Sequence, residues 1–501
     1  MAHSGGVVLG RRKRGRKEEI YYVGGDTHTL CIGATRSGKT RSVVLQSIGL
    51  TALSGESLIV SDPKGELHQY TYPFLERLGY RVLCLDFKNP LKGHRYNFLQ
   101  NVIDAIHAGD IPQAVDSTWD ITSTFVGEAK GERIWTDGEA STIASAILSV
   151  AIDNKDNPQY QNLTNVYHFI ANMCKGSGTN IPMNKYMDTL PETHPARALL
   201  GISDVAPSRT RGSFFTAALT NLRLFTNALI ADMTSESDFA PASIGREKAA
   251  LFIILPDEKT TYYTLASLMV SQVYEALCKE ADARGGRLMR RVLFLLDEFG
   301  NFAPISGMST KLTVGGGRGI RFAFFIQGLA MLTEKYGKEV ASIIQDNCET
   351  WIYLQADGLD TLETLSKKLG QYTVSVQSES NSYGRHSQGS KSQSTNLTGR
   401  SLMTPDEIRL ISRPYSLVTS RNHPAILQSL DLSQWYFNRM FGMGDMEHNR
   451  LLREEREARR PQRPKNVEVP LWGIWKDYQQ QPGMFGRGGF GFPPMNDTDE
   501  E

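Results

Sequence analysis

The residues with the clearest chemistry form one octapeptide, Gly33-Ala34-Thr35-Arg36-Ser37-Gly38-Lys39-Thr40, which matches the pattern Gly-x-x-x-x-Gly-Lys-[Ser/Thr]. The apolar run Leu30 to Ile32 before it predicts the end of a strand, and the run Lys39 to Leu53 predicts a helix. Glycines in such a loop let backbone N–H groups surround phosphates, and the helix N-terminus adds a positive dipole. We therefore expect the octapeptide to bind ATP, with Lys39 at the β- and γ-phosphates and the Thr40 hydroxyl on Mg²⁺.

Two acidic residues, Asp297 and Glu298, follow the apolar run Val292 to Leu296. In phosphate-loop enzymes a buried strand delivers a carboxylate to its C-terminal end to hold Mg²⁺, and this role is predicted for Asp297. A glutamate in the next position accepts a proton from the attacking water or orients it. Adjacent acids after a strand also occur at ordinary helix N-termini. The phosphate loop in the same chain favours a catalytic Glu298.

Two further candidates flank the apolar run Arg321 to Ile326. Gln327 follows it, at the strand end where ligands of open α/β sheets bind, so its amide is a candidate sensor of the γ-phosphate. The alternative is a polar residue that satisfies the strand end. Arg318 precedes the run within Gly315-Gly316-Gly317-Arg318-Gly319, which predicts a flexible loop. Its guanidinium is a candidate arginine finger for a neighbouring subunit, and the alternative is a solvated loop arginine.

A turn, Asp62-Pro63-Lys64-Gly65-Glu66, follows the second expected strand. Proline fixes the turn, and Glu66 falls near a helix start, where the helix dipole favours an acid. On physical grounds alone, a structural turn is the simplest interpretation.

The elements that must position these residues alternate along the chain. Short, continuous apolar runs separated by helical stretches predict a parallel sheet with helices on both faces. The alternation stops near Asn97 and resumes near Lys248, and the runs Ser141 to Ile152, Thr164 to Met173 and Phe214 to Met233 predict a mostly helical insertion between them. The other expected strands are Ser57 to Ser61, Val82 to Leu85, Ala250 to Leu255 and Trp351 to Leu354, with helices at Glu66 to Leu78 and Thr260 to Glu280.

The two ends and one internal segment are polar. Residues 1–24 carry the basic run Arg11 to Lys17 and are expected to form a flexible arm, or to contact a membrane surface or nucleic acid. The Ser-, Gln- and Asn-rich segment Ser375 to Thr398 is expected to be exposed and mobile, because ordering it buries little apolar surface. Residues 441–501 are charged, then Gly- and Phe-rich, then acidic, which predicts a flexible tail.

Composition limits the class of protein. The 501 residues are 22% charged and 40% hydrophobic, with a formal net charge of +1, so a nucleic-acid contact would need a local patch or a lined channel. The 5 cysteines have no paired spacing, which argues against a disulfide framework or a zinc site and favours a reducing cytoplasm. No apolar stretch reaches the length of a membrane span and no secretory signal is visible, so a soluble cytoplasmic protein is expected.

In combination, these motifs resemble the type IV coupling proteins, the TraG/TraD-type conjugation ATPases of type IV secretion systems. The resemblance covers about residues 25–440, and its most family-specific element is the turn Asp62 to Glu66 downstream of the phosphate loop. The other matching segments are His28 to Gly33, Leu85-Asp86, Tyr96 to Leu99, Leu296 to Phe299, Gly317 to Gly319 with Gln327, the Ser-rich stretch, and Arg400 to Glu407.

The resemblance implies an α/β fold: a RecA-like P-loop nucleotide-binding domain, residues 25–98 and 240–440, with an inserted all-α domain, residues 99–239. Most family members begin with transmembrane helices, and none is present here. The resemblance therefore implies a position at the cytoplasmic face of a bacterial membrane, held through a missing anchor or a partner. The basic run Arg11 to Lys17 fits a place just inside such an anchor.

The resemblance also implies a homohexameric ring in which Lys39 and Thr40 bind Mg·ATP, beside the acid pair Asp297-Glu298. It makes Arg318 the arginine that acts in trans and Gln327 the polar sensor. The implied activity recruits relaxase-bound single-stranded DNA, and possible protein effectors, to a secretion channel with its ATPases and inner-membrane components. Two alternatives stay open: another hexameric DNA translocase, and a substrate receptor that uses ATP as a switch.

Overall fold

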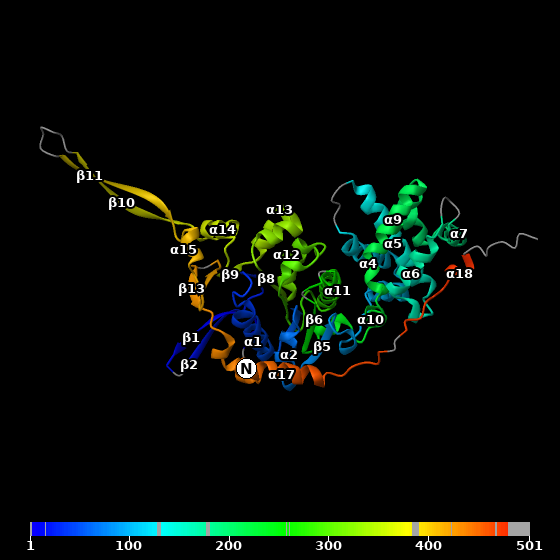
Figure 1. The fold of residues 1–501 in the computed structure, drawn as a ribbon, viewed down its shortest axis with the longest axis horizontal. Helices are drawn as coiled ribbons and strands as arrows, with labels where there is room; N and C mark the ends of the chain where they lie inside the picture. Colours follow the sequence, from blue (N-terminus) through cyan, green and yellow to red (C-terminus); the bar gives the residue numbers. More distant parts are fainter. Residues whose placement is uncertain are drawn as a thin grey trace, which may run out of the picture.

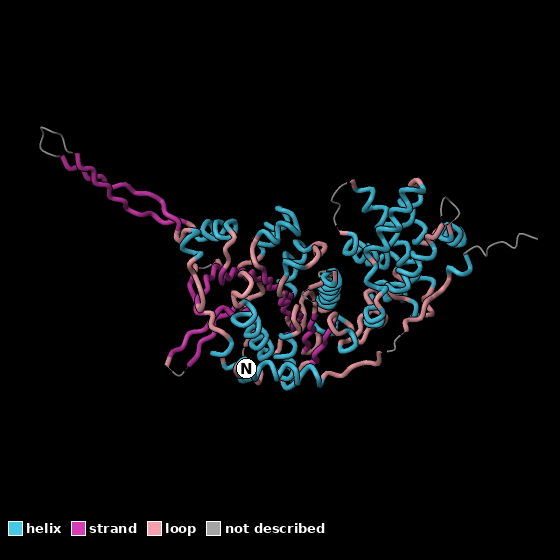
Figure 2. Tube along the Cα trace, in the orientation of Figure 1, coloured by secondary structure: helices cyan, strands magenta, loops and turns pink. Residues whose placement is uncertain are grey.

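The computed structural model describes residues 3–15, 17–127, 132–176, 181–256, 258–259, 261–382, 390–421, 423–465 and 468–478. These residues form a body built on one large sheet, a helical lobe at one side of it, and a long hairpin that projects from the other side (Figure 1). Coloured by secondary structure, the lobe is helical and the sheet lies between helices (Figure 2).

The large sheet has nine strands in the described part of the chain, in the order β13-β12-β9-β3-β8-β7-β4-β6-β5. The pairings from β9 to β5 are parallel, and β12 is antiparallel to both β9 and β13. The parallel strands are buried on both faces, which is why they read as continuous apolar runs. The bounds are β3 (Thr29–Gly33), β4 (Ser57–Asp62), β5 (Arg81–Asp86), β6 (Ala249–Ile254), β7 (Val292–Leu296), β8 (Ile320–Ile326), β9 (Thr350–Gln355), β12 (Tyr415–Thr419) and β13 (Ala425–Gln428).

Two apolar clusters lie on the two faces of the sheet, because successive side chains of a strand point to opposite sides. Cys31 belongs to the cluster beneath α1 and α2, whereas Leu30 and Ile32 belong to the other, which continues into the helical lobe. The expected α/β fold is confirmed. The helices that alternate with the strands are α1 (Leu45–Ser54), α2 (Glu66–Arg77), α11 (Tyr262–Asp282), α12 (Met308–Arg318), α13 (Ala330–Asn347), α14 (Leu359–Leu369) and α15 (Pro405–Arg409).

The segment between β5 and β6 forms the helical lobe. The expected helical run Phe214 to Met233 is helical but consists of the end of α9, a 3₁₀ turn and α10. Asn227 causes the restart, since its side chain accepts a hydrogen bond from the Leu229 N–H as an N-cap. No helix of the described residues combines the length and apolar character of a membrane span. The lobe contains α3 (Gln100–Ala108), α4 (Ile111–Val126), α5 (Arg133–Asp153), α6 (Leu163–Met173), α7 (Pro182–Thr189), α8 (Pro195–Asp204), α9 (Ser208–Asn221) and α10 (Ala228–Met233).

The expected flexible arm at the N-terminus is instead a hairpin, β1 (Val7–Arg14) paired antiparallel with β2 (Lys17–Val23). Val7 and Val8 are buried in the cluster beneath α1, and the Val8 N–H donates to the Ser47 hydroxyl at 2.9 Å. The basic run is therefore carried on an ordered strand. The basic residues make this segment look polar in sequence, although two valines and the β-forming residues of β2 anchor it.

The Ser-rich segment forms the projecting hairpin, β10 (Gln371–Ser382) with β11 (Ser390–Ser401). Its predicted exposure is confirmed for the described side chains, of which Leu397 is 75% exposed. The two strands pair in one antiparallel register from Gln371 opposite Ser401 to Ser382 opposite Ser390, so the segment has regular structure, and its predicted mobility stays a prediction. The tip, residues 383–389, lies outside the described residues.

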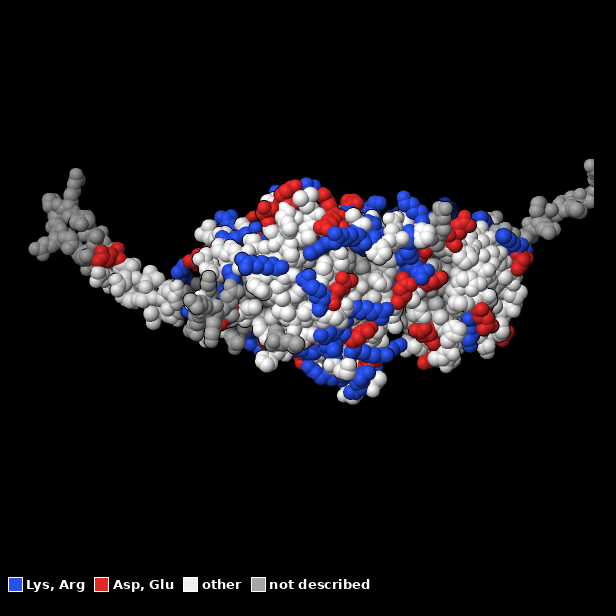
Figure 3. All heavy atoms as spheres, turned by 90° about the horizontal axis from the view of Figure 1, so that it is seen from below, with Lys and Arg blue, Asp and Glu red and all other residues white. Residues whose placement is uncertain are grey.

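The predicted flexible tail is ordered over much of its length. After α16 (Tyr436–Met440), helix α17 (Met446–Arg459) packs below α2. The last described element, α18 (Trp475–Tyr478), lies on the lobe. The charges that suggested disorder pair with the body: Lys92 with Glu457 at 3.0 Å, and Arg460 with the buried Asp86 at 2.7 Å. Seen from below, basic side chains gather at the middle of this face with acidic ones among them (Figure 3). Residues 479–501 lie outside the described residues.

Candidate active site

The sheet topology brings the predicted site residues other than Arg318 to one edge. The phosphate loop follows β3, Asp297 follows β7 and Gln327 follows β8, and these three strands are parallel neighbours in the order β3-β8-β7. Parallel strands end on the same side, where ligands of open α/β sheets bind.

The phosphate loop joins β3 to one wide helical turn, Thr40–Val44, that continues into α1. A Cβ at Gly33 would lie 2.4 Å from the Ser37 hydroxyl, and Gly38 has φ of +93°, so both positions require glycine. The Lys39 side chain is buried, and its ammonium donates to the carbonyls of Gly33 and Ala34 inside the loop. The buried Ser37 hydroxyl finds no hydrogen-bond partner among the described residues. A buried cation and an unsatisfied donor in one loop fit a bound phosphate.

Asp297 lies against this loop, and its Oδ2 accepts a hydrogen bond from the Thr40 hydroxyl at 3.4 Å. Burial, followed by the nearby Glu298 carboxylate, raises the pKa of Asp297 to about 6. A hydroxyl and a carboxylate side by side are the oxygen ligands that Mg²⁺ takes beside substrate phosphates. The pair therefore fits the predicted metal position.

Glu298 stands in a left-handed conformation, with φ of 52° and ψ of 38°, which is rare for a residue with a side chain. Strain of about 1–3 kcal/mol at such a position is typical of functional sites. Its Oε2 accepts a hydrogen bond from the Gln327 amide at 3.2 Å. The structure thus joins two residues that the sequence predicted separately, and the amide of Gln327 fixes the carboxylate.

Arg318 lies elsewhere. The predicted flexible glycine loop is wrong, because residues 315–318 are the last turn of α12 and Gly319 ends the helix at φ of +84°. Arg318 precedes β8 and Gln327 follows it, so the 7 residues of the strand separate them by roughly 23 Å at about 3.3 Å per residue. At the far edge its guanidinium pairs with the exposed Asp282 at 2.9 Å. Within one subunit Arg318 does not reach the phosphate loop.

The turn Asp62 to Glu66 caps α2. Gly65 takes φ of +75° and the helix starts at Glu66, as the turn pattern predicts. The buried Asp62 carboxylate accepts a hydrogen bond from the His68 N–H at 2.8 Å, and burial raises its pKa to about 7. Next to it, the Ser61 hydroxyl donates to the Asp297 carbonyl at 2.8 Å. The end of β4, just before the turn, is thereby hydrogen-bonded to the backbone of Asp297.

Arg413 is a site residue that the sequence did not reveal. It precedes β12, and its guanidinium donates to the carbonyls of Arg36 and of Ser37, the latter at 2.8 Å from Nε. The C=O and N–H of a trans peptide point opposite ways. Because Arg413 holds the Ser37 carbonyl, it also fixes the orientation of the Gly38 N–H in the same peptide unit. A single Arg-Pro step gives no sequence signal for this contact.

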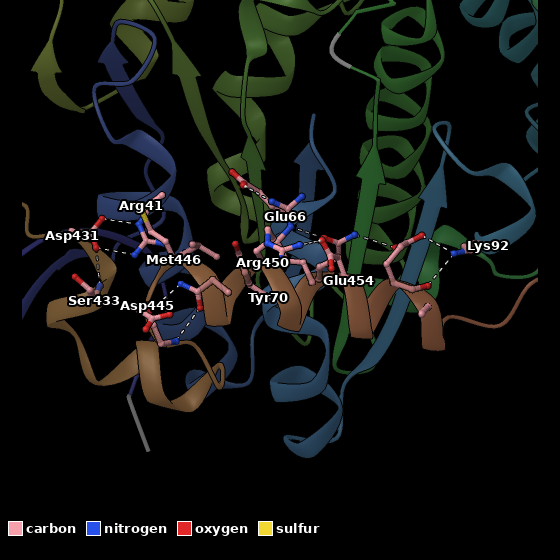
Figure 4. Close-up of a pocket in the computed structure, with 17 residues that line it drawn as sticks. Arg41, Glu66, Tyr70, Lys92, Asp431, Ser433, Asp445, Met446, Arg450 and Glu454 are labelled. Carbon is pink, nitrogen blue, oxygen red and sulfur yellow. Dashed lines mark hydrogen bonds and ion pairs between the residues drawn. The ribbon is translucent and has the colours of Figure 1, made fainter.

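A cavity of about 1140 Å³ opens next to the loop, between α2 and α17 (Figure 4). Arg41, one residue after Thr40, stands at one end of it and forms a bidentate pair with Asp431 at 2.7 and 2.9 Å. Neither Lys39 nor Asp297 lines it. This cavity is therefore a neighbour of the candidate site and separate from Lys39 and Asp297.

The sequence profile of one family, described as type IV secretory system conjugative DNA transfer, matches residues 3–453. The chain belongs to this family. The resemblance to type IV coupling proteins is thereby confirmed. Among its relatives are protein VirD4 of Agrobacterium fabrum, 25% identical over 87% of this chain and 63% of that protein, and conjugal transfer protein TraG of Escherichia coli, 27% identical over 76% and 61%. The chain thus spans about six-tenths of the length of these relatives.

The chain also shares its fold with the plasmid coupling protein TrwB. The structure of plasmid coupling protein TrwB with the non-hydrolysable ATP analogue ADPNP aligns with a TM-score of 0.57 at 16% identity, over 81% of this chain and 86% of TrwB. TrwB with ADP and Mg²⁺ aligns with a TM-score of 0.56 at 16% identity, over 84% and 88%. These matches establish the RecA-like domain with its helical domain as the fold.

Proposed function

We propose that the chain binds ATP with Mg²⁺ at the C-terminal edge of its sheet and hydrolyses it. The observation that carries the proposal is the contact of Thr40 with Asp297 beside the buried Lys39, next to the Glu298–Gln327 pair. The TrwB structures with ADPNP and with ADP and Mg²⁺ support the same ligands for this chain.

Each residue has a distinct proposed role. Gly33 to Thr40 enclose the phosphates, and Lys39 leaves the loop carbonyls to meet the β- and γ-oxygens. Thr40 and Asp297 hold Mg²⁺, which neutralises charge on the phosphates. Glu298 orients the attacking water and accepts its proton, and Gln327 holds that carboxylate in place.

The distance of Arg318 from its own phosphate loop supports a ring. We propose a homohexamer in which Arg318 leaves Asp282 and completes the site of the neighbouring subunit. The pair it leaves is weak, since the Asp282 side chain is 58% exposed and surface ion pairs contribute at most about 1 kcal/mol.

Family membership supports the cellular role. We propose that the ring acts as a coupling protein at the cytoplasmic face of a bacterial membrane. There it recruits relaxase-bound single-stranded DNA, with protein effectors as a further class of cargo, and delivers it to the type IV secretion channel through its ATPases and inner-membrane components.

Steady-state ATP hydrolysis with and without single-stranded DNA tests this proposal. A motor gains several-fold in rate with single-stranded DNA and less with the same length of duplex. Hydrolysis that is unchanged by either DNA at saturating concentration would instead favour a receptor that uses ATP as a switch. For the variant Lys39→Ala, discussed below, the control for charge removal is Lys338→Ala, which replaces an exposed lysine on α13.

A further inference from the structure

The C-terminal segment Glu468 to Tyr478, here called the strap, ends on the helical lobe far from the helix that precedes it (Figure 1). The chain is held as far as Arg463, whose N–H donates to the Leu91 carbonyl of the body and whose guanidinium pairs with Asp232 of the lobe at 2.8 Å. Of the described residues that link Arg463 to the strap, Pro464 and Lys465 are exposed. Residues 464–467, here called the tether, join Arg463 to the strap, and residues 466–467 lie outside the described part of the chain.

Asn165, in the first turn of α6, recognises the strap by its backbone. Its side-chain N–H donates to the Pro470 carbonyl at 3.0 Å, and its side-chain oxygen accepts from the Trp472 N–H at 2.8 Å. Asn165 is 1% exposed, and Asn162, the N-cap of α6, fixes the same amide at 3.2 Å. A buried Asn side chain can donate to one backbone C=O and accept from one backbone N–H. It therefore binds an extended peptide whatever side chain lies between the two bonded residues.

Aromatic rings surround this contact. Trp472 stacks on Phe169 with centroids 5.7 Å apart and planes at 11°, and it meets Tyr186 edge-on at 6.4 Å. Trp475 is buried against His168. Tyr478 also meets Tyr186 edge-on, at 5.7 Å, so Tyr186 of α7 lies between two rings of the strap. Leu471 by contrast is 41% exposed.

We propose that the surface formed by Asn165, His168, Phe169 and Tyr186 is a peptide-binding site for an extended Pro-x-Trp segment, filled in this structure by the chain's own strap. The strap binds reversibly, and a protein segment with the same backbone and a tryptophan two residues after proline takes its place. The specificity lies in the rings, and the tether keeps the strap at a high local concentration. The site does not depend on the proposed ATP hydrolysis.

A fluorescein-labelled peptide of residues 468–478 tests the site in trans, by anisotropy, on the full chain carrying Trp472→Ala and Trp475→Ala. The emptied site binds the peptide, and the parent chain, whose strap competes, binds it at least about tenfold more weakly. Adding Asn165→Ala to the emptied chain abolishes binding, whereas adding Asn172→Ala, on the same helix, leaves it unchanged. A peptide with both tryptophans replaced by alanine is the control ligand.

Hydrogen exchange on the parent chain gives a second measurement that needs no variant. The Trp472 amide, held by Asn165, exchanges slowly, and excess unlabelled peptide accelerates it because the strap is displaced. A folded double variant that does not bind the peptide, or a Trp472 amide whose exchange is unchanged at saturating peptide, overturns the proposal. Circular dichroism of the double variant establishes that it is folded.

Discussion

The two edges of the large sheet both concentrate charged residues, but they leave them in different states. At the N-terminal edge, the fully buried Arg321 pairs with Glu56, which also pairs with Arg291, and the Gly5 N–H donates to the same Glu56 at 2.9 Å. At the C-terminal edge, Lys39 contacts loop carbonyls and Glu298 sits in a strained conformation. Charged groups that are fully paired within the chain stabilise the fold, whereas charged groups without a full set of partners mark a ligand site. We call the N-terminal edge the satisfied edge and the C-terminal edge the incomplete edge.

Lys39→Ala removes the buried cation of the incomplete edge and gives the largest expected effect. ATP hydrolysis falls below detection while the melting temperature stays close to that of the parent, because among the described residues the Lys39 ammonium donates hydrogen bonds to carbonyls of its own loop. If Lys39→Ala hydrolyses ATP at a rate close to that of the parent and of Lys338→Ala, this loop is not the phosphate-binding site.

Arg318→Ala tests whether the N-terminal edge serves another subunit. We expect ATP binding to be unchanged and the concentration-dependent part of hydrolysis to fall by about 10³–10⁵-fold, the usual effect of a trans-acting arginine. Arg284→Ala, which loses an ion pair with Glu280 while Arg246 keeps its own pair with that carboxylate, is the control for charge removal near this edge. Equal losses in both variants would make the effect a general one of that edge.

Glu56→Gln tests the satisfied edge. It leaves Arg321 and Arg291 without their shared carboxylate, and breaking such a buried pair costs about 3–5 kcal/mol. Burial already lowers the pKa of Arg321 to about 10, and Glu56 opposes that shift. Denaturant unfolding measures the loss, and the ATP affinity of the folded fraction stays that of the parent. If Glu56→Gln is as stable as the parent but binds ATP weakly, the N-terminal edge serves ATP binding and does not stabilise the fold.

Glu298→Gln keeps Asp297 and the phosphate loop, so Mg·ATP binding is retained. The rate of hydrolysis falls by about 10²–10⁴-fold, as expected for the loss of a general base. A single-turnover experiment separates binding from chemistry. Unchanged turnover would leave the Glu298–Gln327 contact without a catalytic role.

Arg413→Ala gives the smallest effect. Two charge-assisted hydrogen bonds to the loop are lost, each of about 1.5–3 kcal/mol, and solvent replaces most of their contribution. We expect the Kd for ATP to rise about tenfold with kcat little changed, and Arg413→Lys to recover part of the affinity. Arg409→Ala, an exposed arginine just upstream, should bind ATP as the parent does. A fall in kcat at unchanged Kd would contradict a positioning role.

The sequence predicts which residues meet at the C-terminal edge because each of them adjoins a local pattern. The octapeptide and the acid pair each adjoin a buried apolar strand, and parallel strands bring them together without further information. The contacts of Arg413 and of Asp431 with the loop region join residues more than 370 positions apart. No local pattern encodes them.

Composition also misleads where charge hides packing. In α17 and the segment after it, arginines such as Arg460 pair with buried acids of the body, and two tryptophans of the strap dock on the lobe. The valines of β1 are masked by the adjacent basic run in the same way. In the Ser-rich hairpin, backbone pairing gives order without apolar burial.

In the proposed ring, one subunit supplies the phosphate loop and its neighbour supplies Arg318. The most direct test mixes Lys39→Ala with Arg318→Ala subunits and measures ATP hydrolysis at a concentration where the parent forms rings. Mixed rings contain interfaces with an intact loop on one side and an intact Arg318 on the other, so hydrolysis reappears and is highest near equal proportions. A mixture as inactive as its two components, in rings verified by mass, would contradict the shared site.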